Sequence, residues 1–186
     1  MKSQNTRRMV TTAILIALTI VFQLLRPVLG GTNIISTYII GSLVNLVLIL
    51  AACVVGLWSG VAVAFFAPLF AVLQNHAQLP MVPWIIAGNV VLVIFFALWA
   101  KKDKRLQVEW VRWVIIGAIG TVLKYAVMTL GMTLVQTAAT GKAFGVILGV
   151  AAGAQFVQIV TALIAMVLGG IILPMLPASI VGQSSK

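Results

Sequence analysis

The chain has 186 residues, of which 62% are hydrophobic and 8% are charged, and its formal net charge is +10. Soluble domains carry about 25% charged residues, so this composition excludes an ordinary soluble globular fold. The positive charge does not indicate nucleic-acid binding, because no basic run is interleaved with aromatic residues, and the cytoplasmic loops of membrane proteins collect Lys and Arg.

Six apolar segments approach the length of roughly 20 residues that crosses a bilayer. In chain order they are Met9–Leu29, Tyr38–Trp58, Ser59–Gln74, Met81–Ala100, Val111–Gln136 and Phe144–Leu173. The third is short and follows the second with only the Leu57–Gly60 corner between them. The first is too long for the apolar core of a signal peptide, so we expect it to be a true span. The sequence therefore predicts an all-α membrane protein, a six-transmembrane-helix bundle forming a single domain over residues 1–186.

The distribution of basic residues predicts that both termini are cytoplasmic. With the N-terminus inside, Arg26 and Lys142 are the two basic residues expected outside the cell. Nine of the twelve fall on the cytoplasmic side: Lys2, Arg7, Arg8, Lys101, Lys102, Lys104, Arg105, Arg112 and Lys186. The same topology places four tryptophans in an inner aromatic belt, Trp58, Trp99, Trp110 and Trp113, and Trp84 near the outer interface.

The stretch Gly117–Met128 reads as the middle of a span, yet it contains Lys124. Both acidic residues, Asp103 and Glu109, belong to the cytoplasmic loop and cannot reach this lysine. A charge at the bilayer centre costs about 2.5–3.5 kcal/mol on insertion scales. The lysine could extend toward the interface, lose its proton, or line a water-filled cavity and bind an anion that the chain does not supply. We favour the cavity.

Other polar residues at a similar depth are candidates for the same cavity. We interpret Asn89 and Gln155 as pocket residues, and Asn45 and Gln158 as interhelical hydrogen-bonding groups. Arg26 precedes a proline at the outer end of the first span, where we expect an interface anchor in preference to a second positive group at the pocket mouth.

No catalytic motif accompanies these residues. A phosphate-binding Gly-x-x-x-x-Gly-Lys-Ser/Thr loop is absent, and no acidic residue lies within a span to relay protons. His76 is the only histidine and Cys53, in an apolar run, the only cysteine, so neither a metal site nor a disulfide is expected. We therefore predict a protein with no enzyme activity, cofactor or metal, which binds a ligand and takes its energy from elsewhere.

Ala13 and Ala17 lie in the cytoplasmic half of the first span, and small residues at this spacing let another helix approach closely. With the size, six spans and basic start, they make the chain resemble the substrate-binding S components of energy-coupling factor (ECF) vitamin transporters. Gly145, Gly149 and Gly153 repeat the spacing in the sixth span, where we expect internal packing.

The resemblance implies a multi-pass protein of the bacterial plasma membrane that binds a vitamin from outside, in a pocket capped by the first and third outward-facing loops. It also implies docking through Ala13 and Ala17 on a transmembrane coupling subunit, with two ATPase subunits driving uptake. The residues that it makes pocket candidates are Asn33, Gln74, His76, Trp84, Asn89, Lys124 and Gln155.

The segments "IIAGNVVLVIFFALW" and "GTVLKY" are similar to the branch of this family that includes pantothenate carriers. Pantothenate has one carboxylate, two hydroxyls and an amide, which a lysine, several amides and an aromatic wall would suit. The lack of an acidic pocket residue argues against a cationic vitamin such as thiamine. Neutral vitamins such as pyridoxine or a hydroxymethyl pyrimidine stay open, as do an assembly protein without cargo and an autonomous facilitator.

Overall fold

The computed structural model describes residues 2–31, 33–102 and 108–177 as a helical bundle. Its α-helices are α1 (Lys2–Leu24), α2 (Ile34–Leu50), α3 (Leu57–Leu73), α4 (Val82–Lys102), α5 (Trp110–Thr140) and α6 (Phe144–Ile172). Within these residues, five helices are long and apolar enough to cross a membrane, and α3, with 17 residues, is a shorter apolar helix. The predicted all-α membrane bundle is confirmed.

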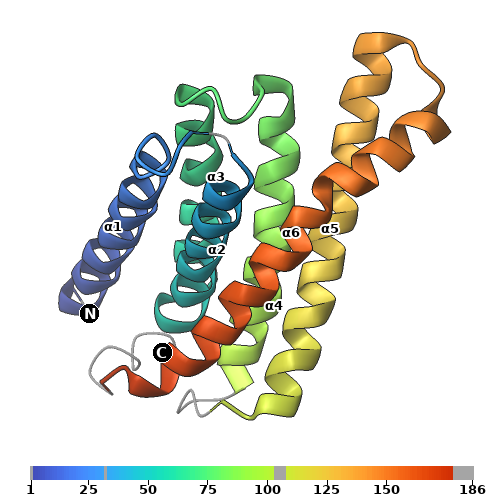
Figure 1. The fold of residues 1–186 in the computed structure, drawn as a ribbon. Helices are drawn as coiled ribbons and strands as arrows, with labels where there is room; N and C mark the ends of the chain where they lie inside the picture. Colours follow the sequence, from blue (N-terminus) through green and yellow to red (C-terminus); the bar gives the residue numbers. More distant parts are fainter. Residues whose placement is uncertain (1, 32, 103–107, 178–186) are drawn as a thin grey trace.

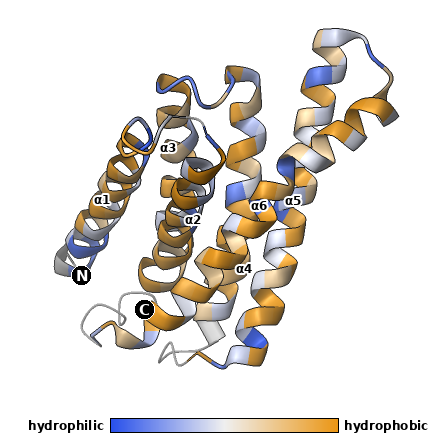
Figure 2. Ribbon diagram, in the orientation of Figure 1, coloured by the Kyte–Doolittle hydropathy of each residue, from blue (hydrophilic) through white to orange (hydrophobic). Residues whose placement is uncertain are grey.

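The bundle has two ends that differ in charge. Figure 1 shows that α1 begins and α6 finishes at the same end, and Figure 2 marks the start of α1 as hydrophilic. This end carries Arg7, Arg8 and Arg112, so the preference of basic residues for the cytoplasm makes it the inner end. Of the basic residues and acids assigned to this side, Asp103, Lys104, Arg105 and Lys186 lie outside the described residues.

The corner between the second and third helices lies earlier in the chain than the sequence suggested. A π-helical turn, Ala51–Val55, extends α2, and Gly56 then breaks the helix with a φ of 123°. Leu57–Gly60 was predicted to be the corner, but these residues form the first turn of α3. Glycine has no Cβ and adopts this backbone conformation at little cost, so Gly56 is where the chain reverses.

The core at the cytoplasmic end is built around aromatic side chains. Trp99 and Trp113 are fully buried, and their ring centroids lie 4.7 Å apart. Phe96 lies at the same distance from Trp113, whose indole N–H donates to the carbonyl of Met166 at 2.9 Å. The prediction of an inner aromatic belt is therefore wrong for Trp99 and Trp113, which join α4, α5 and α6, whereas Trp58 and Trp110 are exposed.

The outer ends of α5 and α6 extend away from the other helices, as Figure 1 shows in orange. A Cβ added at Gly145, Gly149 or Gly153 would meet no atom within 4 Å. The prediction of internal packing for these glycines is wrong, because this part of α6 leaves the bundle. α5 itself contacts α4 at Gly131, where a Cβ would lie 2.2 Å from Cγ of Trp84.

Because the surroundings of these glycines differ, the same glycine-to-alanine substitution should have different effects on stability at the two positions. Gly131→Ala should lower the thermal stability of the purified protein, by about 1–3 kcal/mol, because the methyl group overlaps the rigid root of the Trp84 side chain. Gly149→Ala is the matched control and should leave stability unchanged or raise it, since alanine is the better helix former. Equal melting temperatures for Gly131→Ala and the unmodified protein would contradict the packing of α4 against α5.

Candidate functional site

A cavity of about 360 Å³ lies between the helices and reaches the outer end of the bundle. Every one of the six α-helices contributes to its wall, and the loop residues His76, Ala77 and Gln78 line its outer part. Its volume falls within the range of about 300–1,000 Å³ that is usual for small-molecule pockets. The cavity is therefore large enough to hold a vitamin-sized ligand.

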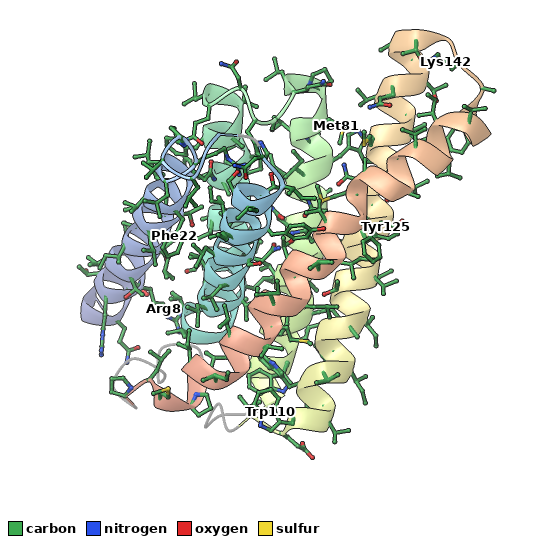
Figure 3. All side chains as sticks on the ribbon, in the orientation of Figure 1. Arg8, Phe22, Met81, Trp110, Tyr125 and Lys142 are labelled. Carbon is green, nitrogen blue, oxygen red and sulfur yellow. The ribbon has the colours of Figure 1, made fainter. Side chains whose placement is uncertain are left out.

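Lys124 lines this cavity and is 2% exposed. It lies midway along α5, next to Tyr125, which Figure 3 labels between Trp110 at the start of the helix and Lys142 just beyond its end. Its ammonium group donates to the Oδ1 atom of Asn45 on α2 at 2.5 Å.

The partner of Lys124 is held in place by a third helix. The side-chain amide of Asn45 donates to Thr161 Oγ1 at 3.1 Å, and Thr161 Oγ1 donates to the carbonyl of Val157 at 2.9 Å. A line of hydrogen bonds thus joins α5, α2 and α6 inside the bilayer. The interpretation of Asn45 as an interhelical bonding group alone is too narrow, because its bond goes to the buried lysine and it lines the cavity as well.

Two close helix contacts allow this arrangement. A Cβ added at Gly41 would lie 2.9 Å from Cγ2 of Thr161, so glycine there lets α2 approach α6. A Cβ at Gly88 would lie 2.8 Å from Cγ of Met128 and 3.4 Å from Cγ of Lys124. The aliphatic stem of the lysine therefore lies against the bare backbone of α4.

No acidic side chain lines the cavity among the described residues. Glu109 is the single acidic residue in the described chain, and it stands at the N-cap position at the cytoplasmic start of α5, without a side-chain capping bond. It precedes Lys124 by 15 positions, or about 22 Å of helix. The charge of Lys124 therefore has a neutral amide oxygen as its partner and no carboxylate from the described part of the chain.

Arg26 is a second cationic group in the same cavity. It is 6% exposed and lines the wall, and neither its Nε nor its Nη1 atom has a hydrogen-bond partner within the described residues. The interpretation as an interface anchor is wrong. The turn after α1 folds back so that the amide of Gly31 donates to the carbonyl of Arg26 at 2.9 Å, and this turn directs the side chain inward.

His76 lies beside Arg26 at the outer part of the cavity. Burial, and secondarily the positive charge of Arg26, lower the pKa of His76 to about 4. The imidazole is thus neutral at neutral pH and can accept or donate a hydrogen bond without adding charge.

The structure brings together four of the seven predicted pocket residues and leaves three outside. Lys124, Asn89, Gln155 and His76 line the cavity. Asn33 is exposed instead and caps α2, accepting a hydrogen bond from the amide of Ser36 at 2.8 Å. Trp84 packs on Gly131, and Gln74 is half-buried at the end of α3; neither contributes to the cavity wall.

The sequence reasoning missed further polar residues of the wall. They are Gln23, Thr37, Gln78, Gln136 and, assigned to packing alone, Asn45 and Gln158. The sequence does contain a signal for Gln23, because Gln23 and Arg26 are three residues apart, the spacing that puts two side chains on one helix face.

Two outer loops line the cavity. They are the first outer loop, between α1 and α2, and the second outer loop, between α3 and α4. The implied third loop, at Gly141–Ala143, contributes none.

The outside of the bundle presents the small residues noted in the sequence. Ala13 and Ala17 are exposed on α1, which is mostly unburied along its length. Neither alanine lines the cavity, which α1 reaches through Gln23. A partner helix can therefore approach α1 without entering the cavity.

A family model described as "ECF transporter, substrate-specific component" matches residues 7–177. The chain belongs to this family. No curated protein and no solved structure matches it. This S component is therefore a multi-pass membrane protein that binds a substrate for transport, is not an enzyme, and works with the energy-coupling module of an ECF transporter.

The position of His76 predicts a dependence of stability on pH. The unfolded chain has a histidine pKa near 6.5 and the folded protein about 4, so the unfolded state binds more protons between these values. Thermal stability should therefore fall as the pH is lowered from 6.5 to 4. His76→Gln should reduce this loss, and an unchanged pH profile in that variant would contradict the buried position of the imidazole.

Proposed function

We propose that this S component captures pantothenate from outside the cell. The observation that supports the proposal is a cavity with two buried cations, Lys124 and Arg26, and no described carboxylate in its wall. A desolvated cation favours an anionic ligand strongly, since a charged partner restores the interactions that water would have supplied. A cationic vitamin such as thiamine would meet two like charges.

The neutral part of the wall suits the rest of the molecule. Pantothenate carries two hydroxyls and an amide, and the wall offers the side-chain amides of Gln23, Asn45, Asn89 and Gln155. Within the described residues, the Oε1 atoms of Gln23 and Gln155 are buried without partners. Acceptors of this kind favour a ligand that brings its own O–H and N–H donors.

The apolar part of the wall suits the paired methyl groups of pantothenate. Several aliphatic and methionine side chains line the cavity: Ile40, Val44, Met81, Ile85, Met128 and Met132. Methionine is flexible and adapts to irregular apolar groups. The aromatic wall expected from Trp84 is replaced by this aliphatic one.

Thermal unfolding of the purified protein with a panel of water-soluble vitamins tests the proposal. Pantothenate at 100 times its Kd should stabilise the fold by about 2.7 kcal/mol. Lys124→Met should remove or strongly reduce this effect, whereas Lys142→Met, which removes an exposed positive charge, should keep it. A shift with pyridoxine or a hydroxymethyl pyrimidine and none with pantothenate would replace the proposal by a neutral vitamin. No shift with any vitamin would refute it.

The exposed small residues of α1 are the proposed docking face for the coupling module. Ala13→Trp or Ala17→Trp should abolish uptake in cells that contain the transmembrane coupling subunit and two ATPase subunits, because a large ring keeps the partner helix at a distance. Vitamin binding to the isolated protein should not change. Val122→Trp on α5, at a similarly lipid-exposed position, is the control and should transport normally. Loss of binding in the α1 variants would contradict a docking role.

A further inference from the structure

We propose that Arg26 binds the carboxylate of the substrate and that Lys124, together with Asn45, binds its hydroxyl end. The inference rests on the proposed function for the choice of ligand. The two cations of the cavity then bind different groups of the ligand. Arg26 binds the ligand's carboxylate near the mouth, and Lys124 binds its hydroxyl end deeper in the cavity.

Arg26 is the better candidate than Lys124 for binding an anion, because fewer of its donors have partners in the described part of the chain. Its side chain is 6% exposed, and its Nε and Nη1 atoms lack hydrogen-bond partners within the described residues. A guanidinium group stays protonated in proteins, so loss of a proton cannot relieve it. Its planar N–H donors match the two oxygens of a carboxylate, a pairing that gives both affinity and orientation.

Lys124 already has part of its coordination. One of its three N–H donors goes to Asn45 Oδ1, and Asn45 is fixed in turn by Thr161. Gln155, elsewhere on the wall, has a buried Oε1 atom without a partner in the described chain. A hydroxyl can accept from the lysine and donate to an amide oxygen, whereas a carboxylate can only accept. The lysine and these amides together therefore favour a hydroxyl.

The two cations lie at different depths. The backbone of Arg26 is bonded to Gly31, and the carbonyl of Gly31 accepts from the hydroxyl of Ser36 in the first turn of α2. Asn45, which holds Lys124, follows Ser36 by nine residues, or about 13 Å of helix. An elongated ligand with an acidic end and a hydroxyl end can therefore span the cavity.

Depth also sets the cost of burying the acid. A carboxylate loses less hydration at the mouth than in the middle of the bilayer, so its ion pair is formed more cheaply there. His76 beside Arg26 is neutral at neutral pH, since burial and the arginine charge lower its pKa to about 4. The mouth thus presents one fixed positive charge to an incoming anion.

The test compares pantothenate with pantothenol, in which a primary alcohol replaces the carboxylate, by calorimetric Kd measurement. The unmodified protein should prefer pantothenate by about 10-fold or more, as expected for a charge-assisted hydrogen-bonded pair. Arg26→Gln should abolish this preference and leave the pantothenol affinity nearly unchanged. Lys124→Met should weaken both ligands alike and keep their ratio. Arg112→Gln, at the cytoplasmic end of α5, is the charge-matched control and should keep both affinities.

Two results would overturn the assignment of Arg26 and leave the proposed function standing. One is a preference for pantothenate that persists in Arg26→Gln. The other is a preference lost in Lys124→Met alone, which would give the carboxylate to the lysine. If Arg26→Gln does not fold, Arg26→Lys keeps the charge without the planar donors, and it should lose most of the preference.

If neither ligand binds the unmodified protein, the proposed function is refuted. The role of Arg26 as a carboxylate-binding residue can then be tested with smaller ligands. N-acetyl-β-alanine carries the same acidic end, and N-acetyl-β-alaninamide is its neutral counterpart. Thermal stabilisation by the acid and not by the amide, lost in Arg26→Gln, would support the carboxylate site. No stabilisation by the acid, or stabilisation that survives in Arg26→Gln, would overturn it.

Discussion

The structure depends on how positive charge is accommodated inside the bilayer without a described acidic partner. Lys124 is held by an amide oxygen of Asn45, and Asn45 is held by Thr161, so three helices share the cost of one buried cation. The glycines Gly41 and Gly88 make this possible, because a side chain at either position would separate the helices that carry these groups. Because the amide oxygen of Asn45 is neutral, it compensates the charge of Lys124 only in part. A polar or anionic ligand can therefore make a further favourable interaction with the lysine.

The remaining architecture separates the cavity from the exposed face of α1 that we propose as the docking surface. The cavity opens at the outer end, and all six helices line it; five of them supply polar residues, including Gln23 near the outer end of α1, whereas α3 supplies Ala67, Pro68 and Ala71. The cytoplasmic half is closed by the packed rings of Phe96, Trp99 and Trp113. A ligand that enters from outside therefore meets packed side chains at the cytoplasmic side of the cavity.

Several local predictions failed for a shared physical reason. Trp99 and Trp113 were assigned to the interface and lie in the core, and Gly149 was assigned to the core and lies on the outside. In a soluble helix the apolar face identifies the core, but in a bilayer the lipid is as apolar as the interior, so composition alone does not distinguish the two sides of a helix. Arg26 failed differently: it was expected at the membrane interface, but the turn that follows α1 leaves it buried in the cavity wall.

The sequence by itself determined the number and order of the helices, the inner side of the membrane and the presence of a lysine that no acidic residue could reach. These follow from segment length, from the side on which basic residues gather and from the cost of a charge in lipid, which are properties of the chain alone. Only the tertiary structure decided which polar groups share the cavity: it joined Asn45 to Lys124, turned Arg26 inward, and left Asn33, Gln74 and Trp84 outside. The reason is that the rotation of each helix about its axis is set by contacts such as those at Gly41 and Gly131, which no periodicity of hydropathy records.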